Sequence, residues 1–153
     1  MAAGDAGSLK RKFRMTPIRR VGDRLVRGLV RFGLIRDTYM LTTLGRKTGQ
    51  PRSNPVVLVE RDHHRWLVAP YGSVSWVLNA RAAGRVTVQR RGHTWECAIR
   101  ELRDASEAAP ILKQYLALTG PPRAYFDANK HDPVEKFEAE AMLHPVFELT
   151  DIK

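Results

Sequence analysis

Beyond residue 37 the chain alternates apolar and polar residues over short stretches, which is the period of β-strands. Turns rich in Gly, Pro, Asn, Asp and charged residues separate these stretches, as they do between paired strands. The pattern predicts strands over residues 39–43, 54–60, 65–69, 85–89, 94–102 and 145–150. Pro55 indicates an edge or a strand start, because proline cannot donate to a ladder. We therefore predict a mainly antiparallel α+β fold, a small barrel of about six strands with inserted helices.

Helices are predicted in the gaps between these strands. Residues 75–83 read as a short helix that ends at Gly84, the residue type that commonly terminates helices. Asp104 and Glu107 have the spacing of a capping box, which predicts that a second helix starts there. A last helix is expected over residues 135–143, just before the closing strand.

The first 36 residues follow a different pattern. Residues 1–15 are small, polar and basic, and we predict that they are disordered. Residues 17–36 have the spacing of an amphipathic helix. Its apolar stripe consists of Ile18, Val21, Leu25, Leu29 and Phe32, and its cationic stripe of Arg20, Arg24, Arg27 and Arg31. Such a helix either lies on an anionic membrane or packs on the domain with its arginines in water.

Charge is concentrated in the same N-terminal segment. The chain carries a net charge of +10, and residues 1–36 contribute +8 of it. We therefore divide the chain into a basic tail with an amphipathic helix (residues 1–36) and a barrel domain (residues 37–153). A single cysteine, with no apolar run of about 18 residues, favours a cytoplasmic protein, peripheral on the inner face of the cell membrane if the basic helix binds lipid. No nucleic-acid partner is expected, because interleaved stacking aromatics are absent.

The turn between the first two predicted strands has the sequence GRKTGQPR over residues 45–52. Two glycines allow the backbone to turn sharply and to expose N–H groups. Arg46, Lys47 and Arg52 add positive charge and Thr48 adds a hydroxyl, a set that suits phosphate or carboxylate groups. From these residues alone the turn is either an anion site or a solvated basic turn.

Other reactive residues predict little chemistry. The five histidines lack the spacing of a metal site, so no bound metal is expected. Cys97 occupies an alternating strand position, which predicts a buried and inert thiol. Trp66 and Trp95 alternate in the same way and are interpreted as core or barrel-lining residues.

Several motifs resemble those of the deazaflavin-dependent nitroreductase and quinone reductase family of actinobacteria. The first is LTT, GRKTGQPR and NP over residues 41–43, 45–52 and 54–55. Later matches, in order, are VA, YG, WVLN, VTVQ and PVFEL, and the resemblance spans roughly residues 37–150. It implies a split β-barrel and reduced coenzyme F420, a deazaflavin with a phosphodiester and a polyglutamate tail.

The resemblance also implies a set of cofactor-binding residues. Those that would hold the phosphate and the acidic tail are Arg46, Lys47, Thr48 and Arg52. Those that would line the path to the ring are Asn54, Pro55 and Val56. Those that would edge the deazaflavin are Ala69, Tyr71 and Gly72. The far wall and the helix start would come from Trp76 and Asn79.

The implied reaction is hydride transfer to a lipophilic acceptor: a quinone, a nitroaromatic or an unsaturated acyl compound. Tyr71, Ser73 or Tyr125 would stabilise the developing anion, and the sequence ranks none above the others. The loop over residues 70–75 differs from that of the nitroreductases, so nitro-drug reduction does not follow. Two alternatives stay open: an FMN-binding split-barrel oxidoreductase, and a non-catalytic lipid- or cofactor-binding barrel. The sequence predicts no particular oligomeric state.

Overall fold

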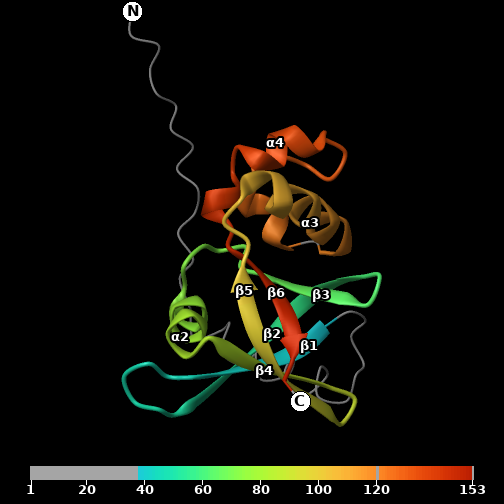
Figure 1. Cartoon of the computed structure of the whole chain (residues 1–153). Helices are drawn as coiled ribbons and strands as arrows, with labels where there is room; N and C mark the ends of the chain where they lie inside the picture. The colour runs from blue at the N-terminus through green and yellow to red at the C-terminus, as the bar shows by residue number, and fades with distance from the viewer. Residues whose placement is uncertain (1–37, 120, 153) are drawn as a thin grey trace, which may run out of the picture.

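The computed structural model describes residues 38–119 and 121–152. Its six strands are β1 (Thr38–Leu44), β2 (Pro51–Arg61), β3 (His64–Val68), β4 (Arg85–Arg90), β5 (His93–Glu101) and β6 (Val146–Asp151). All pairs are antiparallel, and they close into a barrel in the order β1-β2-β3-β6-β5-β4 (Figure 1). The predicted barrel of about six strands is confirmed. The tail and amphipathic helix predicted over residues 1–36 lie outside the described residues.

Alternation along the strands divides the interior into two apolar cores. Leu58 and Phe147 point into the barrel, where they pack with Leu41, Val88 and other residues around α2 (Ser75–Ala83). Their neighbours Val59 and Val146 point outward, into a second core formed with the helices. The period of two in the sequence therefore reflects burial on both faces of the sheet.

The turns explain why the hairpins are tight. Asp62 and His63 both have positive φ, at 51° and 66°, as do Arg91 and Gly92, at 50° and 78°. These are the conformations of two-residue turns whose twist matches that of paired strands. Pro55 lies in mid-strand, where β2 pairs with β1 only, so the predicted edge position is confirmed.

Three α-helices and two 3-10 turns complete the described residues: α2, α3 (Ala105–Leu118), η1 (Pro121–Tyr125), α4 (Val134–Glu138) and η2 (Ala141–Leu143). The helix predicted over residues 75–83 is confirmed, with Gly84 left-handed at its end. The continuous helix predicted over residues 135–143 is wrong, because the chain breaks between α4 and η2. Buried Glu140 lies at this break, where its carboxylate accepts backbone amides from another segment.

The capping box predicted at the start of α3 is confirmed for one of its two residues. Asp104 is its N-cap and accepts a hydrogen bond from the Ser106 amide at 2.9 Å. The side chain of Glu107 pairs with Arg100. The residue pair predicted as a capping box therefore supplies one cap and one ion-pair partner.

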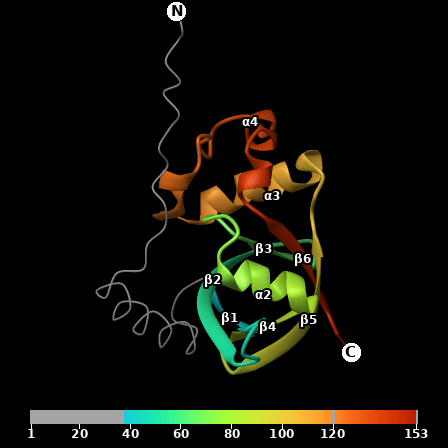
Figure 2. The same ribbon diagram turned by 90° about the vertical axis from the view of Figure 1, so that its left-hand side faces the viewer.

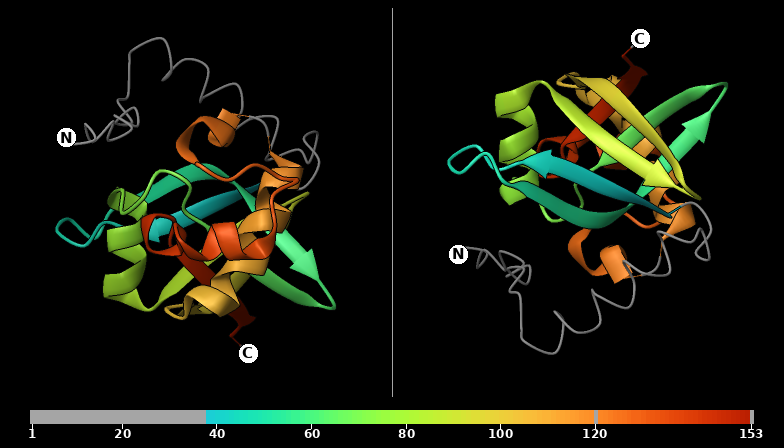
Figure 3. Two further views of the ribbon diagram at one scale, coloured as in Figure 1. Left: turned by 90° about the horizontal axis from the view of Figure 1, so that it is seen from above. Right: turned by 90° about the horizontal axis from the view of Figure 1, so that it is seen from below.

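The helices occupy different parts of the barrel surface. α2 lies along one side and packs on β1 and β4 (Figure 2). α3 and α4 pack on each other and cover one end (Figure 1). The β1–β2 turn projects beside α2, whereas the β2–β3 hairpin projects on the opposite side (Figure 3). Within the described part of the chain, no helix has the length and hydrophobicity needed to cross a bilayer.

Candidate functional site

The cationic turn, residues 45–52, is held by its own backbone. The Gly45 amide donates to the Gln50 carbonyl and the Gly49 amide to the Gly45 carbonyl, both at 2.8 Å. Gly49 has φ +69°, a conformation that favours glycine. A Cβ atom on Gly45 would lie 2.7 Å from Thr48 Oγ1, which accepts from the Gln50 amide at 3.2 Å. The glycines therefore allow a compact turn whose cations project from a fixed backbone.

Asn79 connects this turn to helix α2. Its side chain is 4% exposed, and its Oδ1 accepts from the Arg46 backbone N at 3.1 Å and from Arg46 Nη1 at 3.0 Å. Its Nδ2 lies 3.5 Å from Thr43 Oγ1 at the end of β1. The resemblance placed Asn79 at the far wall and helix start. In the structure it lies within α2 and fixes the direction of Arg46.

A cleft of about 400 Å³ opens between the turn and α2. Its lining residues are Gly45, Arg46, Lys47, Thr48, Arg52, Asn54, Ser75, Trp76 and Asn79. Seven of these were predicted from the sequence as cofactor-binding residues. Gly45 was assigned only a backbone role, and Ser75 was missed as a lining residue. Its place at the first position of α2, next to Trp76, is the signal that could have identified it.

The cations of the turn have no acidic partners in the part of the chain that the structure describes. Arg46, Lys47 and Arg52 are exposed, and none of them forms an ion pair there. Like charges held close together repel one another and attract anions. Among the described residues, the positive charge at the cleft is therefore not compensated.

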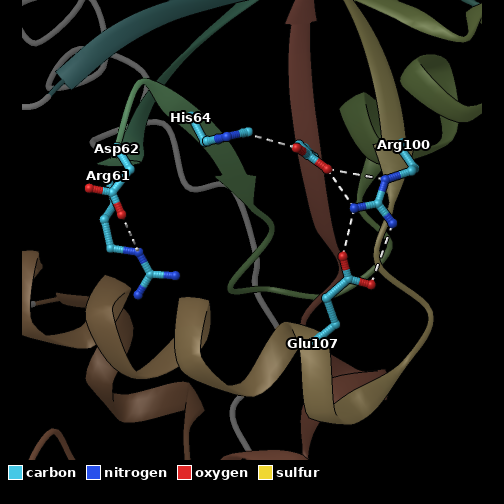
Figure 4. A network of polar contacts seen from close by, with 6 residues as sticks. Arg61, Asp62, His64, Arg100 and Glu107 are labelled. Atoms are coloured by element: carbon cyan, nitrogen blue, oxygen red, sulfur yellow. Dashed lines mark hydrogen bonds and ion pairs between the residues drawn. The ribbon is translucent and has the colours of Figure 1, made fainter.

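Several arginines elsewhere are paired with carboxylates, most clearly Arg100 in the network in Figure 4. Arg100 contacts Glu107 at 2.6 Å and Glu148 at 2.5 Å, and His64 Nδ1 lies 3.2 Å from Glu148. Hydrogen bonds from Arg100, with a smaller contribution from His64, hold the pKa of Glu148 below its usual value. This Arg100 network joins β3, β5, β6 and α3, and its arginine is paired with two carboxylates.

Tyr71 and Tyr125 form a pair of aromatic rings in contact. Tyr71 follows β3, Tyr125 ends η1, and their rings meet edge to face with centroids 4.7 Å apart. Tyr115 of α3 is buried beside them; burial raises its pKa, and the neighbouring Tyr71 raises it further. We call Tyr71 and Tyr125 the tyrosine pair. The loop after β3, which includes Tyr71, runs to the start of α2 (Figure 2), where Ser75 and Trp76 line the cleft.

The other predicted site residues lie outside the lining of the cleft. Ser73 is exposed, and its hydroxyl accepts from Arg81 Nη1 at 3.1 Å. Ala69 is fully buried in the barrel core, so only its backbone could border a ligand. Pro55 and Val56 follow Asn54 in β2 and are partly exposed, and Gly72 has φ +83° in the loop after β3.

Within the described residues, no group of three or more His, Cys, Asp or Glu side chains could hold a metal ion. Cys97 is fully buried in the barrel core. Burial raises its pKa to about 11, although nearby Arg65 opposes the shift. The thiol is therefore protonated at neutral pH, as expected of an inert cysteine.

Known proteins resemble this chain in sequence and in fold. Residues 13–124 match the family model of the F420H2-dependent quinone reductases. A solved F420-H2 dependent reductase, FDR-A, is 25% identical, with coverage of 75% of this chain and 95% of that one and a TM-score of 0.56. A structure described as a domain-swapped dimer is 26% identical over 88% of this chain and all of that one, with a TM-score of 0.58.

More distant structures share the fold. A conserved hypothetical protein from Mycobacterium tuberculosis is 12% identical, covers 93% of this chain and 84% of its own, and has a TM-score of 0.54. The family match covers well over half of the sequence and includes the cationic turn, α2 and Tyr71. This chain therefore belongs to the F420H2-dependent quinone reductase family and is an F420-dependent oxidoreductase.

Proposed function

We propose that the cationic turn binds the acidic tail of reduced F420 and that the ring lies along the cleft toward the tyrosine pair. The observation that carries this proposal is the convergence of Arg46, Lys47 and Arg52 on one cleft with no carboxylate paired to them among the described residues. A phosphodiester followed by several carboxylates supplies the charge that these side chains lack. FMN has a shorter anionic group and gains no support from the family match.

The protein contributes binding and orientation. Bound F420H2 supplies the hydride, from C5 of the deazaflavin. Asn79 holds the Arg46 guanidinium toward the cleft, so little side-chain freedom is lost when an anion binds. Trp76 is half-buried and packs near Phe147, with ring centroids 6.2 Å apart, and offers a rigid wall for a flat ring.

The tyrosine pair would act on the acceptor side. When a quinone receives a hydride it develops negative charge on oxygen, and a phenolic O–H can donate a hydrogen bond to that oxygen or deliver a proton. Tyr71 and Tyr125 are partly exposed and mutually packed. The Ser73 hydroxyl already accepts a hydrogen bond from Arg81, which is paired with Glu101. Because a phenol is a stronger acid than an aliphatic alcohol, we rank the tyrosines above Ser73 as the proton donor.

A lipophilic acceptor suits the surroundings of the tyrosine pair. Met142 and Leu143 of η2 are 79% and 56% exposed, and a Cβ on Gly72 would lie 3.6 Å from the Leu143 carbonyl oxygen. Exposed apolar residues beside the Tyr71 loop favour contact with an apolar molecule. Among the three acceptor classes, we propose a quinone first, with nitroaromatics and unsaturated acyl compounds as alternatives.

The test is an oxidation assay with purified protein. Reduced F420 would be mixed with quinones, nitroaromatics and unsaturated acyl compounds, and the recovery of deazaflavin absorbance would be followed. We expect protein-dependent oxidation that is fastest with an apolar quinone. Fluorescence titration with F420 and FMN should show tight binding of F420 only. Stronger binding of FMN, or no turnover with any acceptor, would contradict the proposal.

The basic helix predicted over residues 17–36 supports a second, separate proposal: attachment to an anionic membrane where lipophilic acceptors dissolve. Vesicle flotation would test it with full-length protein and a variant in which Arg20, Arg24, Arg27 and Arg31 become glutamine. We expect the wild type to float with anionic vesicles and to stay behind with zwitterionic ones. Equal flotation of the variant would contradict membrane attachment through these arginines.

A further inference from the structure

A buried ion pair, His144 with Glu140, contacts residues next to both tyrosines of the tyrosine pair. His144 and Glu140 are 3% and 4% exposed, and His144 Nε2 lies 3.1 Å from Glu140 Oε1. Burial of two ionisable side chains is costly unless each is paired and hydrogen-bonded. Every contact of this pair therefore matters, and those contacts reach two separate segments of the chain.

Glu140 holds the segment that follows Tyr125. Its two carboxylate oxygens accept the backbone amides of Asp127 at 3.0 Å and Ala128 at 2.8 Å. Hydrogen bonds to an ionised acceptor are about twice as strong as neutral ones, so this chain segment is firmly fixed. The requirement for both oxygens also explains why the chain leaves the helical path at Glu140.

His144 holds the segment that precedes Tyr71. Its Nδ1 lies 2.8 Å from the Pro70 carbonyl oxygen, which can only accept, so Nδ1 carries a proton. The imidazole also contacts Phe126, the residue after Tyr125, whose ring stacks on it with centroids 3.8 Å apart. One side chain thus touches the neighbours of both tyrosines.

We propose that His144 and Glu140 are positioning residues that clamp the two tyrosine-bearing segments together and so set the geometry of the acceptor site. The inference rests on the proposed role of the tyrosine pair in F420-dependent reduction. Tyr71 and Tyr125 come from segments far apart in the sequence, and their edge-to-face contact joins two segments that lie outside the strands of the barrel. The clamp fixes the positions of these two segments relative to each other, which strand pairing cannot do because neither segment is part of a strand.

The clamp is separate from the element that holds the cationic turn. Asn79 and the backbone of the turn fix Arg46, and the cleft lining does not include His144 or Glu140. Loss of the clamp should therefore change acceptor kinetics much more than cofactor affinity. Misplacement of an active-site group by about 1 Å can cost up to about 100-fold in rate.

The experiment compares full-length His144→Gln and Glu140→Gln with a matched control, His131→Gln, at an exposed position. Glu140→Gln leaves one acceptor oxygen where two backbone amides donate. His144→Gln removes the ring that stacks on Phe126. For both clamp variants we expect kcat/KM for the acceptor to fall by about 10- to 100-fold. F420 affinity should change by less than about threefold, and His131→Gln should behave as wild type. Wild-type acceptor kinetics in correctly folded clamp variants would overturn the proposal.

Amide hydrogen exchange gives a readout that does not depend on activity. We expect faster exchange at Asp127, Ala128 and Gly72 in the clamp variants, with the cationic turn unchanged. Unchanged exchange at these amides would overturn the clamp even if F420 turnover were never observed. Failure of wild-type protein to bind F420 would instead count against the proposed function alone.

A second variant serves if the substitutions at the ion pair prevent folding. Phe126→Leu removes the stacked ring and leaves both His144 hydrogen bonds in place. We expect a smaller fall in acceptor kcat/KM, about threefold to tenfold, with unchanged F420 affinity. Wild-type kinetics in this variant would contradict the role of His144 as the joint between the two segments.

Discussion

The cationic turn and the Arg100 network use the same residue type for different purposes. In the network, Arg100 is neutralised by Glu107 and Glu148, and the contacts link three strands to a helix. In the turn, Arg46, Lys47 and Arg52 lie around a cleft without acidic partners among the described residues. Pairing, rather than net charge, therefore distinguishes the structural cluster of cations from the candidate binding site.

The two regions also differ in how the backbone is supported. The Arg100 network lies on strands and α3, so its geometry follows from the sheet. The turn is a loop, and it depends on two glycines and on Asn79 to hold its cations in place. A polar loop that is fixed by a buried side chain is typical of a preorganised site on a rigid scaffold.

The largest expected effect comes from removing charge from the turn. Lys47→Ala with Arg52→Ala should weaken F420 binding by about 100-fold or more, because each charged hydrogen bond contributes about 1.5–3 kcal/mol. Fluorescence titration measures the affinity. Arg100→Ala is the matched control and should leave it unchanged. Equal losses in both variants would mean that general positive charge, and not the turn, attracts the cofactor.

Removal of the Asn79 side chain should have a smaller effect on F420 affinity. Asn79→Ala leaves the Arg46 amide without its buried acceptor and frees the guanidinium. We expect F420 affinity to fall by about tenfold and the free energy of unfolding by about 1–2 kcal/mol. Titration and urea denaturation give the two values, and an unchanged affinity would show that Arg46 needs no support.

Substitutions in the Arg100 network should change the free energy of unfolding and leave F420 binding unchanged. The folded-state pKa of Glu148 is lowered from 4.5, so its contribution to stability is present above that pH and is lost as the pH falls through the folded pKa. Glu148→Gln should therefore cost about 1 kcal/mol at pH 7 and almost nothing well below pH 4.5. Urea denaturation at both pH values measures this, and an equal cost at both would contradict an ionic origin.

The last prediction concerns the Cys97 thiol and the cation beside it. Arg65 contacts Cys97 but is already paired with Asp151, and burial raises the pKa of the thiol to about 11. Folded protein should therefore react with a thiol reagent at about pH 8 at least about 10-fold more slowly than urea-unfolded protein. Comparable rates would show that a paired arginine still activates its neighbour.

Much of the fold could be predicted, because the alternation of apolar and polar residues and the residues that end helices and strands indicate the same elements. Helix α2 has the predicted bounds, since the left-handed Gly84 ends it as its sequence indicates. The segment over residues 135–143 could not be predicted, because its break depends on Glu140 meeting amides twelve or more residues away. Likewise, the side chain of Glu107 pairs with Arg100 on β5 and does not complete the predicted capping box.

The candidate site also has parts that could be predicted from the sequence and parts that could not. The cationic turn is contiguous in the sequence, so the cations that line the cleft could be predicted from local spacing and resemblance. Their role in binding the cofactor stays a prediction. The contact of Asn79 with Arg46 depends on where α2 lies beside the turn, which no local pattern specifies. The His144–Glu140 pair could not be found from the sequence, since its partners Pro70, Asp127 and Ala128 come together only in the fold.

The central claim is that the turn recognises the acidic tail of the cofactor. The most direct measurement compares the binding of full-length F420 with that of its tail-less deazaflavin chromophore, for the wild type and for the Lys47→Ala, Arg52→Ala double variant. We predict that the wild type binds F420 at least about 100-fold more tightly than the chromophore and that the double variant loses this difference. Equal affinity of the wild-type protein for both molecules would contradict the account.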